Sequence, residues 1–212
     1  MAVQQSLPFP AGRGGRREGA GRKRGNKISH HKRTSFGRPT PAHVTVRVRR
    51  HVWNLRSRRC HRLIGRCLEE AAGRLGLRVI EYSVLGNHVH FIVEADSADA
   101  LSRGMQGLCI RIAKALNRLM HRAGGVFDDH YDGRLLTTPT ELVRAIAYVL
   151  RNAEHRFGSK GPDTFSSDGL GPEERRARLA IPVSWLLTTG WRRASPADLH
   201  RLRGSAFAGR GG

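Results

Sequence analysis

Two β-rich runs separated by only two residues constrain the fold of this chain more than any other feature. They are LRVIEYSVL at residues 77–85 and HVHFIVEA at residues 88–95, and Gly86 and Asn87 lie between them. Such a short connection predicts that the two runs pair as neighbouring antiparallel strands. Glycine at the first central position favours a type II′ turn, which requires a positive φ at that residue.

The remaining pattern surrounds this hairpin with alternating strands and helices. Its periodicities predict a strand beginning at His43, a helix after Ser57 that ends at Gly76, a helix from Ala98 to about Arg122, and a short strand within residues 126–137. The order strand, helix, strand, strand, helix, strand predicts an α+β fold, a ferredoxin-like antiparallel sheet (βαββαβ) with two helices on one face. Such a fold does not by itself determine an activity.

A third helix follows this unit and has an unusually clear beginning. Thr138 is expected to be its N-cap, Pro139 to occupy its first helical position, and Glu141 to complete a capping box. The apolar periodicity continues to about Phe157, and Gly158 is expected to end the helix. The chain therefore carries one helix more than the sheet and its two-helix layer require.

Positive charge is the main compositional feature. The chain has 38 Lys and Arg residues against 17 acidic residues, a formal net charge of +21. Self-repulsion at this charge opposes a compact state unless a polyanion binds, so nucleic acid is the expected partner. Residues 1–40 combine Gly and Arg with few large apolar side chains and are expected to be a disordered basic arm. A folded domain at 41–158 and a loop with a basic tail at 159–212 complete the predicted organisation.

Membrane and disulfide-rich classes fit the sequence poorly. No apolar run approaches the roughly 20 residues of a membrane-spanning helix, and no signal-peptide pattern is present, so a cytoplasmic protein with no membrane partner is expected. The cysteines Cys60, Cys67 and Cys109 are odd in number and lie in helical patterns. Their spacing fits neither a disulfide framework nor a zinc cluster, and they are expected to be reduced core residues.

Two histidines stand one residue apart in the second hairpin strand, where apolar residues would build the strand more cheaply. Alternate side chains of a strand share a face, so His88 and His90 point away from Val89, whose side suits the two-helix core. Neutral imidazoles at this spacing can jointly hold a divalent metal. A lone His-x-His pair is weak evidence in a chain with 11 histidines, and a purely structural role stays open on this pattern alone.

The third helix offers two further candidates, Tyr148 and Asn152, which are four residues apart and therefore on one side of the helix. Tyr148 also fits the role of a core aromatic, and that alternative stays open. Asn152 fits a structural role less well, because a carboxamide is disfavoured in the last third of an apolar helix face. Its oxygen is a suitable hard ligand to complete a two-histidine metal site.

Together these two motifs resemble a known family. The run GNHVHFIVE, followed some fifty residues later by AYVLRNAEHRFG, resembles the HUH single-tyrosine transposases, and most closely the REP-associated tyrosine transposase group. The resemblance covers roughly residues 41–158 and is weaker in the Gly-Arg arm and in SWLLTTGWRR. By position it implies that His88 and His90 bind metal, that Tyr148 is the nucleophile, and that Asn152 completes the metal coordination. The family's Asn-Pro is here Asn152-Ala153, which leaves the helix unbroken.

The resemblance also implies an activity, that of a metal-dependent transesterase that cleaves and rejoins DNA at hairpin or repeat sequences. Mg or Mn would offset charge on the scissile phosphate. Attack by Tyr148 would give a 5′-phosphotyrosine and a free 3′-OH. Single-stranded or hairpin DNA is the implied partner of a monomer or homodimer. Two alternatives stay open: a noncatalytic nucleic-acid-binding protein derived from such a transposase, and a hydrolytic nuclease or phosphoesterase, whose second His-containing motif is missing here.

Overall fold

The structure is a computed structural model that describes residues 35–72, 74–158 and 161–211. Most of the expected basic arm lies outside these residues. The strands are β1 (Thr40–Arg47), β2 (Leu77–Val84), β3 (His88–Ala95) and β4 (Asp132–Leu135). The helices are α1 (Arg58–Ala71), α2 (Ala98–Leu119), α3 (Pro139–Phe157), α4 (Pro172–Arg178), α5 (Trp185–Thr188) and α6 (Pro196–His200). Four 3₁₀ turns are η1 (Arg74–Gly76), η2 (Ser167–Gly169), η3 (Gly190–Arg193) and η4 (Ala208–Gly211).

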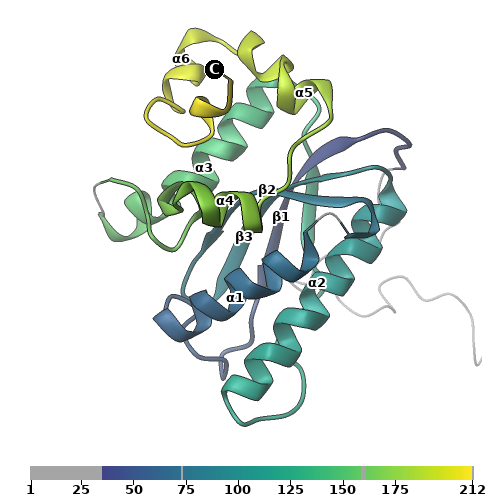
Figure 1. Cartoon of the computed structure of the whole chain (residues 1–212), viewed down its shortest axis with the longest axis vertical. Coiled ribbons are helices and arrows are strands. Elements are labelled where there is room, and N and C mark those ends of the chain that lie inside the picture. The colour runs from purple at the N-terminus through teal and green to yellow at the C-terminus, as the bar shows by residue number, and fades with distance from the viewer. Residues whose placement is uncertain (1–34, 73, 159–160, 212) are drawn as a thin grey trace, which may run out of the picture.

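The four strands form one antiparallel sheet in the order β2-β3-β1-β4 (Figure 1). Helices α1 and α2 pack against one face of the sheet, and α3 packs against the other. This is the predicted ferredoxin-like βαββαβ arrangement with an additional helix. The central strands β1 and β3 pair from Thr40↔Ala95 to Arg47↔His88, so the polar residues of β1 and the histidines of β3 are brought side by side.

The face of the sheet towards α1 and α2 is an apolar core. Val89, Phe91 and Val93 of β3 are at most 1% exposed and belong to it, as strand alternation predicts. The three cysteines are free, as expected. Burial raises the pKa of the Cys67 thiol to about 11 and that of the Cys109 thiol to about 12, so both stay protonated at neutral pH.

The hairpin between β2 and β3 forms as predicted, but the expected type II′ turn is wrong. Gly86 does not have the positive φ that this turn requires at its first central position. Instead, the carbonyls of Gly86 and Asn87 accept hydrogen bonds from the backbone N–H groups of Leu55 and Val48, each at 2.9 Å. The chain between β1 and α1 therefore holds the turn, and tertiary hydrogen bonds outweigh the local preference.

The end of the first helix also differs from the expectation. Helix α1 ends at Ala71, whereas the periodicity predicted that it would continue to Gly76. Leu75 is 61% exposed and has a φ of 58°, and Gly76 has a φ of 67°. Two consecutive left-handed residues redirect the chain into β2, which begins at Leu77. The apolar side chain of Leu75 continued the helical pattern without being part of the helix.

Helix α3 matches its predicted limits. The Thr138 hydroxyl accepts a hydrogen bond from the N–H of Glu141 at 3.2 Å, and Gly158 ends the helix with a φ of 64°. The Glu141 carboxylate accepts the N–H of Thr137 at 3.1 Å, one residue before the position expected in a capping box. The helix is unbroken at Asn152 and the alanine that follows it.

The segment after α3, expected as a loop and tail, contains the short helices α4 to α6 and packs on the domain. Leu186, Leu187 and Phe207 join the apolar core beneath α3. The N–H of Val84 on β2 donates to the carbonyl of Phe165 at 2.8 Å, so this segment also covers the β2 edge of the sheet. Within the described residues, none of the helices has the length and hydropathy needed to span a bilayer.

Candidate active site

The sheet face beneath α3 changes character along β3. His88, His90, Ile92 and Glu94 alternate with the residues of the opposite core and therefore share this face. Ile92 is fully buried in the apolar core under α3, whereas His88 and His90 are 4% and 5% exposed and carry ring nitrogens at the same depth. The expected position of both histidines, opposite the valine core, is confirmed.

His88 has one ring nitrogen fixed by a neighbouring side chain. Its Nδ1 lies 2.7 Å from the side-chain oxygen of Asn87. An amide oxygen only accepts hydrogen bonds, so Nδ1 carries the proton and Nε2 keeps its lone pair. Burial, reinforced by the charges of Arg47 and Arg156, lowers the pKa of His88 to about 4. The ring is therefore neutral at pH 7, which is the form that binds a metal.

His90 lies at the centre of the site. Its Nδ1 is 3.0 Å from Oγ1 of Thr45 and 3.1 Å from Nε2 of His43, both on β1. Its buried Nε2 has no hydrogen-bond partner among the residues that the structure describes. Burial, together with the neighbouring His88, lowers the pKa of His90 to about 3. Protein contacts thus engage one nitrogen of the ring and leave the other open.

His43 is a candidate that the sequence did not reveal. Its ring centroid lies 5.2 Å from that of His90 and 5.9 Å from that of Tyr148. Burial is the main cause of the lowered pKa of His43. The alternation in β1 was a usable signal, because the polar residues between its buried valines must share the face opposite the valine core. The register that brings Thr45 opposite His90 was not readable from that alternation.

Helix α3 places Tyr148 beside the histidines. The ring meets His90 edge to face, with centroids 5.3 Å apart. Tyr148 is 48% exposed, so it is accessible to a large substrate. That exposure also contradicts the alternative of a core aromatic, because core residues of this size are buried almost completely in this protein, as Tyr82 is.

Asn152 lies one helical turn after Tyr148 and is 3% exposed. Its Nδ2 is buried without a hydrogen-bond partner among the described residues. One turn further, Arg156 is close enough for its charge to lower the pKa of both His88 and His90. Asn152 therefore lies between two α3 residues that each approach the histidine pair. Rotation of its carboxamide by half a turn presents the oxygen in place of the unpaired nitrogen.

Glu94, the acidic residue on the same face of β3, is fully engaged elsewhere. Its carboxylate accepts the N–H groups of Ser184 at 2.7 Å and Val183 at 2.9 Å, and Nε of Arg78 at 2.6 Å. Burial alone would raise the pKa of Glu94, but these hydrogen bonds outweigh it and lower the pKa. No group of three His, Cys, Asp or Glu side chains in the described part of the chain is arranged to hold a metal. A metal site here would thus consist of imidazoles and an amide.

Comparison with known proteins identifies the fold. No protein-family model and no curated protein sequence matches this chain. Among solved structures it is similar to a REP-associated tyrosine transposase bound to a REP hairpin, with a TM-score of 0.54 and 16% sequence identity, covering 74% of this chain and 94% of that one. The chain has the tyrosine transposase fold. The family resemblance stated from the motifs is thus confirmed at the level of the fold.

A second solved structure, assigned as a transposase of Deinococcus radiodurans R1, has a TM-score of 0.41 and 14% sequence identity. That match covers 52% of this chain and 89% of the other chain. Within the tyrosine transposase fold, the candidate site of this chain lies between α3 and the β1–β3 pair at the centre of the sheet.

Proposed function

We propose that this chain is a metal-dependent HUH-type tyrosine transposase that cleaves and rejoins single-stranded DNA at hairpin or repeat sequences through a 5′-phosphotyrosine intermediate. One observation carries the proposal. The half-exposed Tyr148 ring on α3 lies 5.3 Å from the ring of His90, whose buried Nε2 has no partner among the described residues. These are the residues to which the sequence motifs assign the nucleophile and the metal.

His88, His90 and Asn152 would hold the divalent metal, Mg or Mn. The residues fit such an ion, because both imidazoles are neutral and because His90 Nε2 and Asn152 Nδ2 are buried without partners in the described structure. The side-chain oxygen of Asn87 accepts a hydrogen bond from Nδ1 of His88. Neighbouring groups commonly orient metal-binding imidazoles in this way. When bound, the ion supplies positive charge that offsets the charge developing on the scissile phosphate.

Tyr148 supplies the attacking oxygen. A phenol has a pKa of about 10, so its proton must leave as the new bond to phosphorus forms. The Tyr148 oxygen becomes bonded to the phosphate at the 5′ end of the break, and the displaced 3′ oxygen takes up a proton as a free 3′-OH. Since one phosphodiester replaces another, attack by a 3′-OH on the phosphotyrosine rejoins a strand without ATP.

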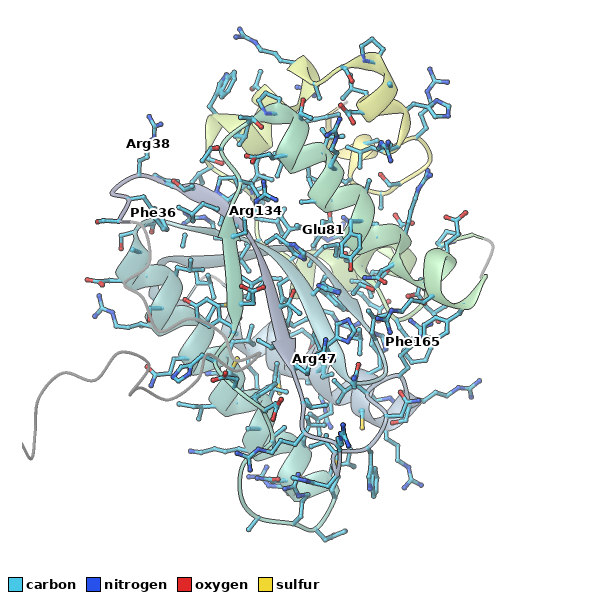
Figure 2. All side chains as sticks on the ribbon, turned by 180° about the vertical axis from the view of Figure 1, so that it is seen from behind. Phe36, Arg38, Arg47, Glu81, Arg134 and Phe165 are labelled. Atoms are coloured by element: carbon cyan, nitrogen blue, oxygen red, sulfur yellow. The ribbon has the colours of Figure 1, made fainter. Side chains whose placement is uncertain are left out.

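Two exposed arginines flank the site and favour a polyanionic substrate. Arg47 pairs with His88 across β1 and β3 and lies on β1 in Figure 2, and Arg156 is on α3. Neither forms an ion pair within the described part of the chain. Their guanidinium groups are free to contact phosphates on either side of the scissile bond.

A covalent-adduct assay tests this proposal. Full-length protein is incubated with labelled single strands that carry repeat hairpins, with Mn, Mg or a chelator, and resolved on a denaturing gel. A protein–DNA band that requires metal is expected for the wild type and for Tyr131→Phe, whose ring lies in the opposite core. The band should be absent for Tyr148→Phe, with DNA affinity nearly intact because only one hydroxyl is lost.

The other outcomes separate the alternatives. DNA binding without any adduct favours the noncatalytic nucleic-acid-binding protein. Metal-dependent cleavage that leaves a free 5′-phosphate and no adduct favours the hydrolytic nuclease. An adduct that persists in Tyr148→Phe assigns the nucleophile to another residue and contradicts the proposal.

A further inference from the structure

The loop between β1 and α1, residues 48–57, carries a concentration of charge that the fold does not require. Residues 47–59 read RVRRHVWNLRSRR and contain six arginines and no acidic residue. The exposed arginines are Arg47, Arg49, Arg50, Arg58 and Arg59. A run of like charge this dense is repulsive in the free protein and favours a polyanion at this surface.

Trp53 lies in the middle of this loop and is 46% exposed. Its neighbours Val52 and Leu55 are buried, at 8% and 1% exposure, and the N–H of Val52 donates to the carbonyl of Arg49 at 3.0 Å. The N–H of Ser57 donates to the carbonyl of Asn54, also at 3.0 Å. Buried anchors on both sides thus hold the backbone in place while the indole faces solvent.

Two hydrogen bonds attach the loop to the candidate active site. Leu55 and Val48 donate their N–H groups to the turn at Gly86 and Asn87, and Asn87 contacts Nδ1 of His88. The loop is thereby fixed to the residues directly before the first histidine.

The end of α3 meets the same loop and adds a second exposed ring. Phe157 is 55% exposed and directly follows Arg156. The guanidinium of Arg56, at the end of the loop, lies 4.9 Å from the Phe157 ring centroid and forms an ion pair with Asp163 at 2.8 Å. Exposed single aromatics are common on proteins, but Trp53 lies within this arginine-rich loop and Phe157 lies beside its Arg56, and exposed rings combined with arginines are a recurrent arrangement for binding single strands.

We propose that this surface binds unpaired nucleotides of single-stranded DNA beside the histidine–tyrosine site, with a base stacked on Trp53. We name it the Trp53 platform and define it by Trp53, Phe157 and the five exposed arginines given above. The arginines contact phosphates, and the indole contacts the π-face that every base has, so the platform selects unpaired bases and not a sequence. This inference rests on the proposed function, because it states how the substrate of that site is held.

Binding of labelled DNA to the full chain tests the platform by fluorescence anisotropy. The probes are a mixed-sequence single strand, an abasic strand of equal length, and a duplex. Trp53→Ala is expected to weaken binding of the single strand by about 5- to 150-fold while changing the other two little. Trp53→Phe retains most of the affinity, and the salt dependence is unchanged because no charge is lost.

Trp185→Ala is the matched control. Trp185 is 52% exposed and lies beside Arg193, with 5.2 Å between the guanidinium and the ring, but it belongs to the C-terminal segment and not to the platform. Its loss should leave single-strand affinity unchanged. Wild-type affinity in Trp53→Ala, or an equal loss for single, abasic and duplex DNA, overturns the proposal.

A second measurement applies if Trp53→Ala does not fold. The chain has three tryptophans, so Trp185→Phe combined with Trp191→Phe leaves Trp53 as the only indole emitter. Its fluorescence should be quenched by the single strand and not by the abasic strand, and unquenched emission overturns the proposal. Adduct formation by Tyr148 is scored on the same samples. An adduct without base-dependent binding refutes only the platform, and base-dependent binding without an adduct refutes only the transposase mechanism.

Discussion

Phe91 and His90 are neighbours on β3 and are both almost fully buried, yet they face different surroundings. Phe91 points into the apolar core beneath α1 and α2. His90 points towards α3, where its Nε2 has no hydrogen-bond partner among the described residues. Burying an unpaired polar atom destabilises the folded state, whereas burying a phenyl ring stabilises it. One strand therefore stabilises the domain on one face and gives up stability on the other.

The α3 face shows a second contrast between its two ends. At one end, Glu94 is as deeply buried as His90 but accepts three hydrogen bonds, from Ser184, Val183 and Arg78. At the other end, His90 and Asn152 each keep one atom without a partner in the described structure. Buried polar atoms without hydrogen-bond partners are expected at functional sites. Among the described residues, the ring nitrogen of His90 and the amide nitrogen of Asn152 are such atoms at the end of this face that Tyr148 borders.

Substitutions on the two faces of β3 should differ most in their effect on stability. Phe91→Ala is expected to lower the free energy of unfolding by about 3–5 kcal/mol, because it leaves a cavity in the main core. The double substitution His88→Ala and His90→Ala should change it by less than about 1 kcal/mol, since little apolar burial is lost and removing an unpaired buried nitrogen offsets the lost contacts at Nδ1. Urea unfolding in chelator measures both values.

The same double variant should also lose metal-dependent cleavage. A loss of stability as large as that of Phe91→Ala, in metal-free buffer, would show that the histidines are structural. Loss of cleavage in that variant would then not support a metal site, because an unfolded protein is inactive whatever role the histidines have.

Glu94→Gln should have the next largest effect, at the satisfied end of the α3 face. Removing the charge from these buried hydrogen bonds is expected to cost about 2 kcal/mol. The folded state lowers the pKa of Glu94 below its ordinary value of 4.5, so its contribution is present above that pH and is lost as pH falls through the folded pKa. The free energy of unfolding should therefore decrease less steeply in Glu94→Gln than in the wild type as the pH is lowered from neutral to acid. If the free energy of unfolding depends on pH identically in both proteins, the Glu94 carboxylate does not stabilise the fold.

Much of the fold was predictable because local signals agree with tertiary structure. Alternation in β3 separated Val89 from His88 correctly, and Thr138 and Gly158 fixed the limits of α3. The Gly86-Asn87 connection failed to predict the type of the β2–β3 turn, because backbone donors from the β1–α1 loop determine its conformation. The helical periodicity misplaced the end of α1, because left-handed backbone at Leu75 interrupts the helix while the apolar pattern continues in the sequence.

The site was predictable only in part. The spacing of Tyr148 and Asn152 marked them as candidates but left a core role open for Tyr148, and the roles assigned to them rest on the family resemblance. His43 and Thr45 reach His90 through the register between β1 and β3, which joins segments more than forty residues apart and is set by tertiary packing. The short C-terminal helices have too few turns for periodicity to reveal them.

Substitutions at Asn152 test the end of the face where polar atoms lack partners. We expect them to change the metal requirement of cleavage by about tenfold. Asn152→Ala should raise the Mn concentration needed for half-maximal cleavage by about that factor, because one ligand is lost. Asn152→Asp keeps an oxygen ligand and should be milder, and Asn117→Ala on α2 serves as the control. If neither substitution at 152 shifts the metal titration, Asn152 is not a ligand, and water or a group other than the engaged Glu94 completes the site.

Thr45→Val should have the smallest effect and tests why His90 presents Nε2. Metal binding at Nε2 requires the proton of His90 on Nδ1, where Oγ1 of Thr45 at 3.0 Å and Nε2 of His43 at 3.1 Å can accept it. Valine has nearly the shape of threonine and the same preference for strands, so β1 should persist. Losing one acceptor should weaken Mn binding, measured by calorimetry, by less than the roughly tenfold to hundredfold typical of losing such a contact, because His43 remains.

Combining Thr45→Val with His43→Phe removes both acceptors and should bring the loss into that full range, while Thr45→Ser restores wild-type binding. The free energy of unfolding in chelator should change little in Thr45→Val, which separates an effect on the ring's tautomer from an effect on the strand. If Mn affinity is unchanged in the single and the combined variant, contacts at Nδ1 do not select the ligating nitrogen.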